Sequence, residues 1–105
     1  MTFEHEPQPT HLGRDVVDAR LAPVGKVTDV LFDDREAQAT WAVVKTGVFG
    51  GEHYMPLVDS YIDEAGRLVV PFDKASVKRA PRASREHVIS PTVAGELRHY
   101  YGVAA

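Results

Sequence analysis

The sequence predicts a mainly β domain: a small antiparallel barrel or sandwich of five or six short strands, followed by one short C-terminal helix. Segments rich in β-branched and aromatic residues are separated by glycine, proline and acidic turn residues, a spacing typical of small antiparallel folds. Helical spacing of apolar residues is absent before Pro71 and is clear only near the C-terminus. A chain of 105 residues has the length of one domain.

The composition excludes several classes of function. Hydrophobic residues make up 44% and charged residues 26%, as in ordinary globular proteins, and a net charge of −3 gives no overall attraction to nucleic acid or anionic membranes. There is no cysteine, which excludes disulfides, thiolate catalysis and cysteine-based zinc sites and suits a reducing cytoplasm. No apolar run approaches the ~20 residues that span a bilayer. We therefore expect a soluble, cytoplasmic protein.

The chain begins with a segment that lacks periodicity. Residues 1–11 carry glutamates and prolines, so we expect a mobile N-terminal arm. Residues 12–18 predict a first short strand, and the segment around Pro23 predicts the turn that follows it.

Residues 25–34 form the longest strand-like run. Strict alternation fails there, because Val27 has the parity of Leu31 whereas Val30 has the opposite parity. Either both faces of this strand are partly covered, or a bulge near Thr28 and Asp29 resets the register.

Two more strands follow, over residues 40–46 and 52–57, with strong β formers such as Trp41. Between them, residues 47–51 contain three glycines, which predicts a turn with positive φ angles or a close backbone approach. Pro56 has no N–H for a ladder bond, so we expect it on an edge strand or at a bulge.

The last two strand segments form a hairpin, because residues 60–63 and 67–70 flank a short loop that contains glycine. Residues 73–79 predict one or two helical turns capped by Asp73, and the polar residues 81–89 predict an extended connector.

The C-terminal helix has the clearest boundaries. Ser90 is a candidate N-cap, Pro91 suits the first helical position and Gly102 is placed to end the helix. Its apolar residues share one face, so the helix must dock on its own sheet or on a neighbouring subunit. These residues are Val93, Leu97, Tyr100 and Tyr101.

Spaced residues across three strands resemble those of a known family. The matching segments are Leu12-Gly13-x-x-Val16-x-Asp18, Gly25-Lys26-Val27-x-Asp29-Val30-x-Phe32-Asp33, Trp41-x-Val43-Val44, Gly47-Val48-Phe49-Gly50 and Met55-Pro56. They resemble the PRC-barrel domain, which is named after the cytoplasmic part of the photosynthetic reaction-centre H subunit and also forms half of a ribosome-maturation factor. The resemblance covers residues 12–81. Residues 84–102 resemble the tail of stand-alone bacterial PRC-barrel proteins.

The resemblance implies a small antiparallel β-barrel of about six strands that serves as a docking or assembly module without catalysis. No part of the sequence resembles the membrane helix of the reaction-centre subunit or the RNA-binding half of the maturation factor, so neither role is carried over. The expected organisation is therefore an arm over residues 1–11, the barrel over 12–81, and a connector with the helix over 82–105.

No pattern in the sequence indicates catalysis, a cofactor or a metal. The five histidines are scattered without the i, i+4 spacing of a zinc helix, and the aspartates Asp29, Asp33 and Asp34 do not match a calcium loop. The serines include no nucleophile elbow. The glycine-rich turn lacks the ending of a phosphate-binding loop. The chain is therefore expected not to be an enzyme.

Two surfaces are candidates for binding a partner. The first is apolar: Phe49, Val93, Leu97, Tyr100 and Tyr101. It predicts a protein partner, most simply a second copy in a two-fold homodimer. The second is basic: Lys74, Lys78, Arg79, Arg82 and Arg85. It predicts contact with RNA or an acidic partner, although it lacks interleaved aromatic residues that would stack on bases.

Overall fold

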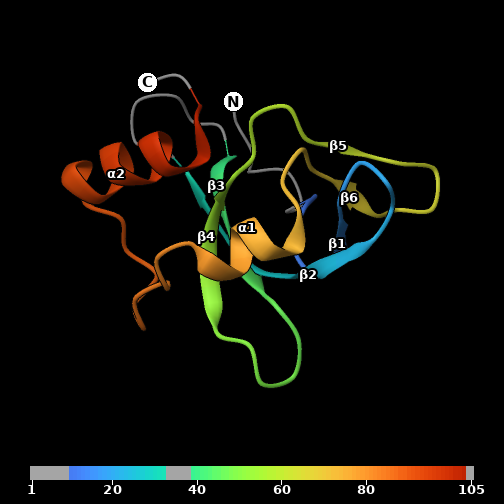
Figure 1. Ribbon diagram of the computed structural model, residues 1–105, viewed down its shortest axis with the longest axis horizontal. Helices are drawn as coiled ribbons and strands as arrows, with labels where there is room; N and C mark the ends of the chain where they lie inside the picture. Colours follow the sequence, from blue (N-terminus) through green and yellow to red (C-terminus); the bar gives the residue numbers. More distant parts are fainter. Residues whose placement is uncertain (1–9, 33–38, 104–105) are drawn as a thin grey trace, which may run out of the picture.

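The computed structural model describes residues 10–32 and 39–103. Most of the predicted N-terminal arm and the residues Asp33 and Asp34 lie outside these ranges. The described elements are the strands β1 (Asp15–Val17), β2 (Pro23–Phe32), β3 (Ala39–Lys45), β4 (Glu52–Pro56), β5 (Tyr61–Ile62) and β6 (Leu68–Val69) and the helices α1 (Lys74–Arg79) and α2 (Pro91–Tyr101). The mainly β class with a short C-terminal helix is confirmed (Figure 1).

The six strands form one mixed sheet in the order β4-β3-β2-β1-β6-β5. All neighbouring pairs are antiparallel except β1 and β6, which are parallel. No ladder joins β4 to β5 among the described strands, so the sheet is open at these two edges. The predicted small antiparallel barrel of about six strands is therefore confirmed only in part, because the described sheet is not closed and one of its strand pairs is parallel. The β1–β6 pair joins segments that lie far apart in the sequence, so no local pattern signals its direction.

The bulge predicted in the longest strand is present in β2. The register between β2 and β3 shifts between Val27 and Asp29, so Thr28 is the extra residue. As a result, Val27 and Val30 both pack against the same hydrophobic cluster although they are three residues apart, and Leu31 packs against the cluster on the other face. The shift explains why simple alternation fails in the sequence.

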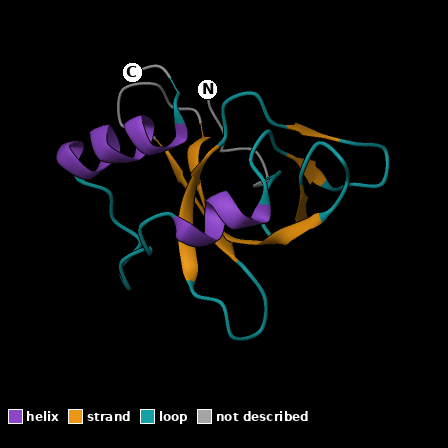
Figure 2. Cartoon of the chain, viewed as in Figure 1, coloured by secondary structure: helices purple, strands orange, loops and turns teal. Residues whose placement is uncertain are grey.

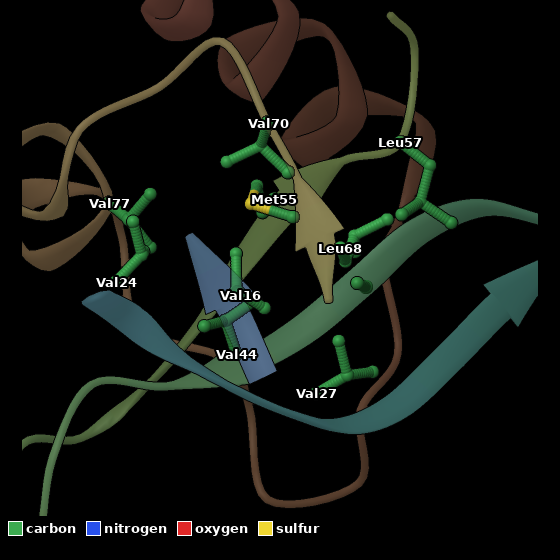
Figure 3. Close-up of a cluster of buried hydrophobic side chains, with 10 residues drawn as sticks. Val16, Val24, Val27, Val44, Met55, Leu57, Leu68, Val70 and Val77 are labelled. Carbon is green, nitrogen blue, oxygen red and sulfur yellow. The ribbon is translucent and has the colours of Figure 1, made fainter. Parts of the chain in front are cut away.

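The sheet is buried on both faces. In β3, Ala42 and Val44 belong to one cluster, whereas Trp41 and Val43 belong to the other. The first cluster is aliphatic and includes Val77 of α1; Figure 3 shows its side chains pointing toward one another. Its members are Val16, Val24, Val27, Ala42, Val44, Met55, Leu57, Leu68, Val70 and Val77. The second cluster lies under α2.

Both helices begin where the sequence indicates. The Asp73 side chain accepts a hydrogen bond from the N–H of Ser76, and Ser90 accepts one from Val93. Helix α2 ends at Gly102, whose φ of 71° is in the left-handed region. Pro56 lies in β4, an edge strand, as its missing N–H requires.

Helix α2 packs on the sheet of its own chain. Leu97 is 0% exposed and lies in the second cluster with Trp41 and Tyr54. The hydroxyl of Tyr101 donates to the backbone oxygen of Tyr54 at 2.6 Å. Of the two arrangements open at the level of sequence, the chain has the one in which the helix folds back.

The segment between α1 and α2, residues 80–90, is called the connector below (Figure 2). It is not continuously extended, contrary to the prediction. The backbone of Arg82 pairs with that of His53 in β4 as an isolated antiparallel β-bridge. A turn follows in which the backbone N–H of His87 donates to the backbone oxygen of Ser84 at 3.0 Å. The connector therefore stays in contact with the sheet, and α2, which follows it, packs on the same sheet.

Candidate functional site

A groove lies between α2, the connector and the ends of β2 and β3. It encloses about 650 Å³. Its lining combines apolar and polar groups in similar amounts, and Trp41 of β3 is almost fully buried beside it. We call it the Trp41 groove, and it is lined by Leu31, Phe32, Trp41, His87, Val88, Ile89, Ser90, Pro91, Ala94 and Arg98.

Large apolar side chains remain uncovered along the groove. Phe32 is 56% exposed and Val88 is 65% exposed. Across from them, the guanidinium of Arg98 lies 5.8 Å from the centroid of the Trp41 ring, within the range of a cation–π interaction. The groove therefore combines exposed apolar surface with a cation that the indole holds in place.

The connector wall of the groove is tied to the sheet through His87. The Nδ1 atom of His87 lies 2.7 Å from an oxygen of Asp29 on β2, and Nε2 lies 3.0 Å from an oxygen of Glu52 on β4. The hydroxyl of Thr28 donates to the second oxygen of Glu52 at 2.7 Å. We call these four residues the His87 cluster.

The bulge in β2 explains how this cluster is built. In a regular strand, Thr28 and Asp29 would point to opposite faces of the sheet. The register shift at Thr28 instead lets Thr28 contact Glu52 while its neighbour Asp29 contacts His87. His87 itself has a φ of 55°, in the left-handed region, which turns its ring back toward the sheet.

The cluster shifts the acidity of its members in opposite directions. The side-chain hydrogen bond with Glu52, followed by that with Asp29, raises the pKa of His87. The hydrogen bond from Thr28, followed by that from His87, lowers the pKa of Glu52. Both effects favour an imidazolium facing two carboxylates.

A second set of hydrogen bonds supports the same wall. The hydroxyl of Tyr54 donates to the backbone oxygen of Val88 at 3.0 Å and accepts from the N–H of Ser84 at 3.2 Å. The N–H of Val88 donates to the hydroxyl of Ser84 at 3.2 Å. The turn before Val88 is therefore held both by Tyr54 and by the His87 cluster.

The structure does not bring the predicted apolar contact residues into one surface. Phe49 is 98% exposed at the turn between β3 and β4, which lies away from α2 (Figure 1). On α2, Leu97 is buried, Val93 and Tyr101 are half-buried and Tyr100 is exposed. Leu97 and Tyr101 face the sheet because the apolar stripe of α2 covers the second cluster.

The predicted basic residues lie on α1 and the connector, and all of them are exposed. They are Lys74, Lys78, Arg79, Arg82 and Arg85. None of them lines the Trp41 groove.

Sequence reasoning missed the groove and the pairing of His87 with Asp29. The adjacent apolar residues Val88 and Ile89 in an otherwise polar segment were a local signal for the groove wall. No such signal exists for the His87 cluster, because residue 87 is 58 positions from Asp29 and 35 from Glu52.

In the part of the chain that is described, no group of three histidine or acidic residues is arranged to hold a metal ion. The described helices include none that is both long and apolar enough to cross a membrane.

Comparison with known families gives one match. The family model described as the PRC-barrel domain matches residues 10–78, more than half of the chain. A search of curated proteins found none that matches.

Proposed function

This chain belongs to the PRC-barrel domain family, and from that premise we propose that it is a non-enzymatic protein-interaction module whose partner binds in the Trp41 groove. The observation that carries the proposal is the open groove itself, with the apolar side chains of Phe32 and Val88 uncovered along it.

The chemistry of the groove suits a protein segment. Tryptophan and arginine are among the residues that contribute most to protein interfaces, and here Arg98 lies over Trp41. A large apolar side chain of a partner would cover Phe32 and Val88 and remove their surface from water.

The polar groups of the groove support binding rather than catalysis. The Ser90 hydroxyl accepts the N–H of Val93 as the cap of α2, and both ring nitrogens of His87 face carboxylates. A nucleophile needs a base within hydrogen-bond reach, and a general base needs a free nitrogen or oxygen. Neither arrangement is present among the described lining residues of the groove.

Phe49 supplies a second contact in this proposal. It stands with Val48 at the tip of the β3–β4 turn, and both side chains are almost fully exposed. We propose that the module acts in the cytoplasm and self-associates as a two-fold homodimer, with Phe49 and Tyr100 as exposed contacts. Light scattering on the full chain at micromolar concentration tests the dimer, and a monomeric mass would contradict it.

Site-specific photo-crosslinking tests the groove. A photoreactive amino acid replaces Val88, and a matched variant carries it at Val58, an exposed valine outside the groove. We expect a discrete crosslinked protein from position 88 in native cells, identified by mass spectrometry, and no such product from position 58. Equal products from both positions, or none from position 88, would contradict the proposal.

A gel retardation experiment separates a protein partner from RNA. If the basic residues of α1 and the connector bound RNA, the protein would retard RNA in a gel with a steep dependence on salt concentration. Charge reversal of Arg82 and Arg85 would then abolish the complex, whereas Arg98→Glu in the groove would leave it intact.

A further inference from the structure

We propose that the His87 cluster is a proton-operated latch for the Trp41 groove: the imidazolium of His87 ties the connector to β2 and β4, and loss of its proton releases the connector wall. This inference names the regulation of the groove and so rests on the proposed function. It is carried by the position of His87 between two carboxylates and at the start of the groove wall.

The two contacts of His87 require a doubly protonated ring. An ionised carboxylate only accepts hydrogen bonds, so each contact needs an N–H on the ring nitrogen. A neutral imidazole has one N–H and one lone pair, and it satisfies one carboxylate while facing the other with a lone pair. Both contacts, at 2.7 Å to Asp29 and 3.0 Å to Glu52, can be hydrogen bonds to ionised carboxylates at the same time only in the imidazolium.

The surrounding charges favour that state. Asp29 from β2 and Glu52 from β4 face the ring directly, and Lys45 from β3 acts on Glu52. Arg98 of α2 lines the same groove, and Arg85 and Glu86 precede His87 in the connector with exposed side chains. One imidazolium between two carboxylates leaves an excess of negative charge, which raises the pKa of His87.

The backbone at His87 depends on these contacts. Its φ of 55° is uncommon for a residue with a side chain, although histidine is among the types that adopt it most often. A residue in the left-handed region persists where its surroundings hold it there. When one carboxylate contact is lost, the turn over residues 84–88 loses a restraint on that conformation.

The latch acts on the groove because Val88 and Ile89 follow His87 directly and both line it. The restraint that remains after deprotonation is the set of bonds among Tyr54, Ser84 and Val88. The expected response is therefore a loosened wall, with α2 still docked through Leu97.

A metal ion is a poorer explanation of the cluster than a proton. Both ring nitrogens of His87 already face carboxylates, so neither is free to bind a cation that Asp29 and Glu52 would share. No metal-binding group of three such side chains occurs within residues 10–32 and 39–103.

Nuclear magnetic resonance of the full ¹⁵N-labelled chain tests the latch without any partner. The His87 ring nitrogens are followed from pH 5 to pH 9, and the protection factor of the Val88 amide against hydrogen exchange is measured at both ends. We expect both ring nitrogens to be protonated at low pH and the midpoint to lie above the ordinary value of 6.5.

The two measurements must agree quantitatively. If protonation of His87 controls the wall, the protection factor of the Val88 amide is lower at pH 9 than at pH 5. The expected fall is about tenfold for each pH unit by which the His87 midpoint exceeds its ordinary value. His87→Gln removes the pH dependence of the protection factor. His99→Gln, on an exposed histidine of α2, retains it.

A midpoint at or below 6.5, or a protection factor that does not change across a raised midpoint, would overturn the proposal. The outcome is independent of the proposed function, since it is measured on the protein alone. A chain that shows the latch but crosslinks to nothing from position 88 refutes only the function of the groove.

Discussion

One face of the sheet is covered by aliphatic side chains from five strands and α1, whereas the other is covered by α2 around Trp41 and is then left open at the groove. The aliphatic face buries a continuous cluster of apolar side chains, with the partly buried Phe72 and Tyr101 packed against it. The α2 face combines aromatic residues, the His87 cluster and uncovered apolar surface. The difference indicates that the first face mainly stabilises the fold, whereas the second face carries the proposed binding site.

The largest effect is expected from truncating the aliphatic face. Leu68→Ala removes a side chain that is 0% exposed at the centre of the first cluster. We expect a loss of roughly 3 kcal/mol in the free energy of unfolding, because the aliphatic cluster cannot collapse into the cavity. Denaturant titration measures it, and Leu12→Ala at an exposed position is the control. Equal losses from both variants would contradict this view of the face.

Leu97→Ala makes the matching change on the α2 face. Leu97 is as fully buried as Leu68, but it lies beside an open groove into which its neighbours can relax. We expect a loss of about 2 kcal/mol, at the lower end for a buried leucine. The loss should come with faster hydrogen exchange in α2 while β1 and β6 stay protected. Uniform loss of protection would show that the two faces unfold together.

The β3–β4 turn joins the strands that carry both faces. A Cβ at Gly50 would lie 2.1 Å from the backbone oxygen of Thr46, although Gly50 does not have a positive φ. Gly47 has a φ of 102°, which strains any residue with a side chain. We expect Gly50→Val and Gly47→Val each to cost more than about 1 kcal/mol. Wild-type melting curves for both variants would refute this.

The contribution of the α2 face to the stability of the fold should depend on pH, whereas that of the aliphatic face should not. Because the folded pKa of His87 is raised, its contribution is complete below the ordinary value of 6.5 and is lost as pH rises through the folded value. Because the folded pKa of Glu52 is lowered, its contribution is complete above 4.5 and is lost as pH falls through the folded value.

Between pH 4.5 and pH 6.5 we expect the His87 cluster to contribute about 1 kcal/mol to the free energy of unfolding. The contribution is small because solvent screens the partly exposed carboxylates. Thermal melts at pH 6 and pH 9 measure this contribution. His87→Gln should remove most of the difference between the two melts, whereas Leu68→Ala should keep it.

The smallest expected effect is a gain on the α2 face. A Cβ at Gly95 meets nothing within 4 Å, and Gly95 lies on the exposed side of α2. Gly95→Ala should raise the free energy of unfolding by roughly 0.5–1 kcal/mol, because alanine loses less backbone entropy in a helix. Chemical denaturation measures the change. Destabilisation by alanine here would show that the surface of α2 needs the glycine for another reason.

Much of the local structure of this chain could be predicted from short stretches of sequence. The caps at Asp73 and Ser90, the turn at Gly47 and the end of α2 at Gly102 follow from residues within a few positions of each other. The failed alternation in residues 25–34 left two explanations open, and the pairing of β2 with β3 shows the bulge at Thr28. The family resemblance was equally readable, because its spaced glycines and aspartates lie within short segments of the sequence.

The parallel pairing of β1 with β6, the open sheet and the His87 cluster depend on contacts between segments that are distant in the sequence. Leu97 and Tyr101 were chosen as contact residues for their apolar stripe, but the same stripe covers Trp41 and Tyr54 of the chain itself. A helix face carries no information about which apolar surface will bury it. His87 meets Asp29 and Glu52 only because the bulge, β4 and the turn of the connector converge, and such convergence depends on backbone paths that no short stretch of sequence encodes.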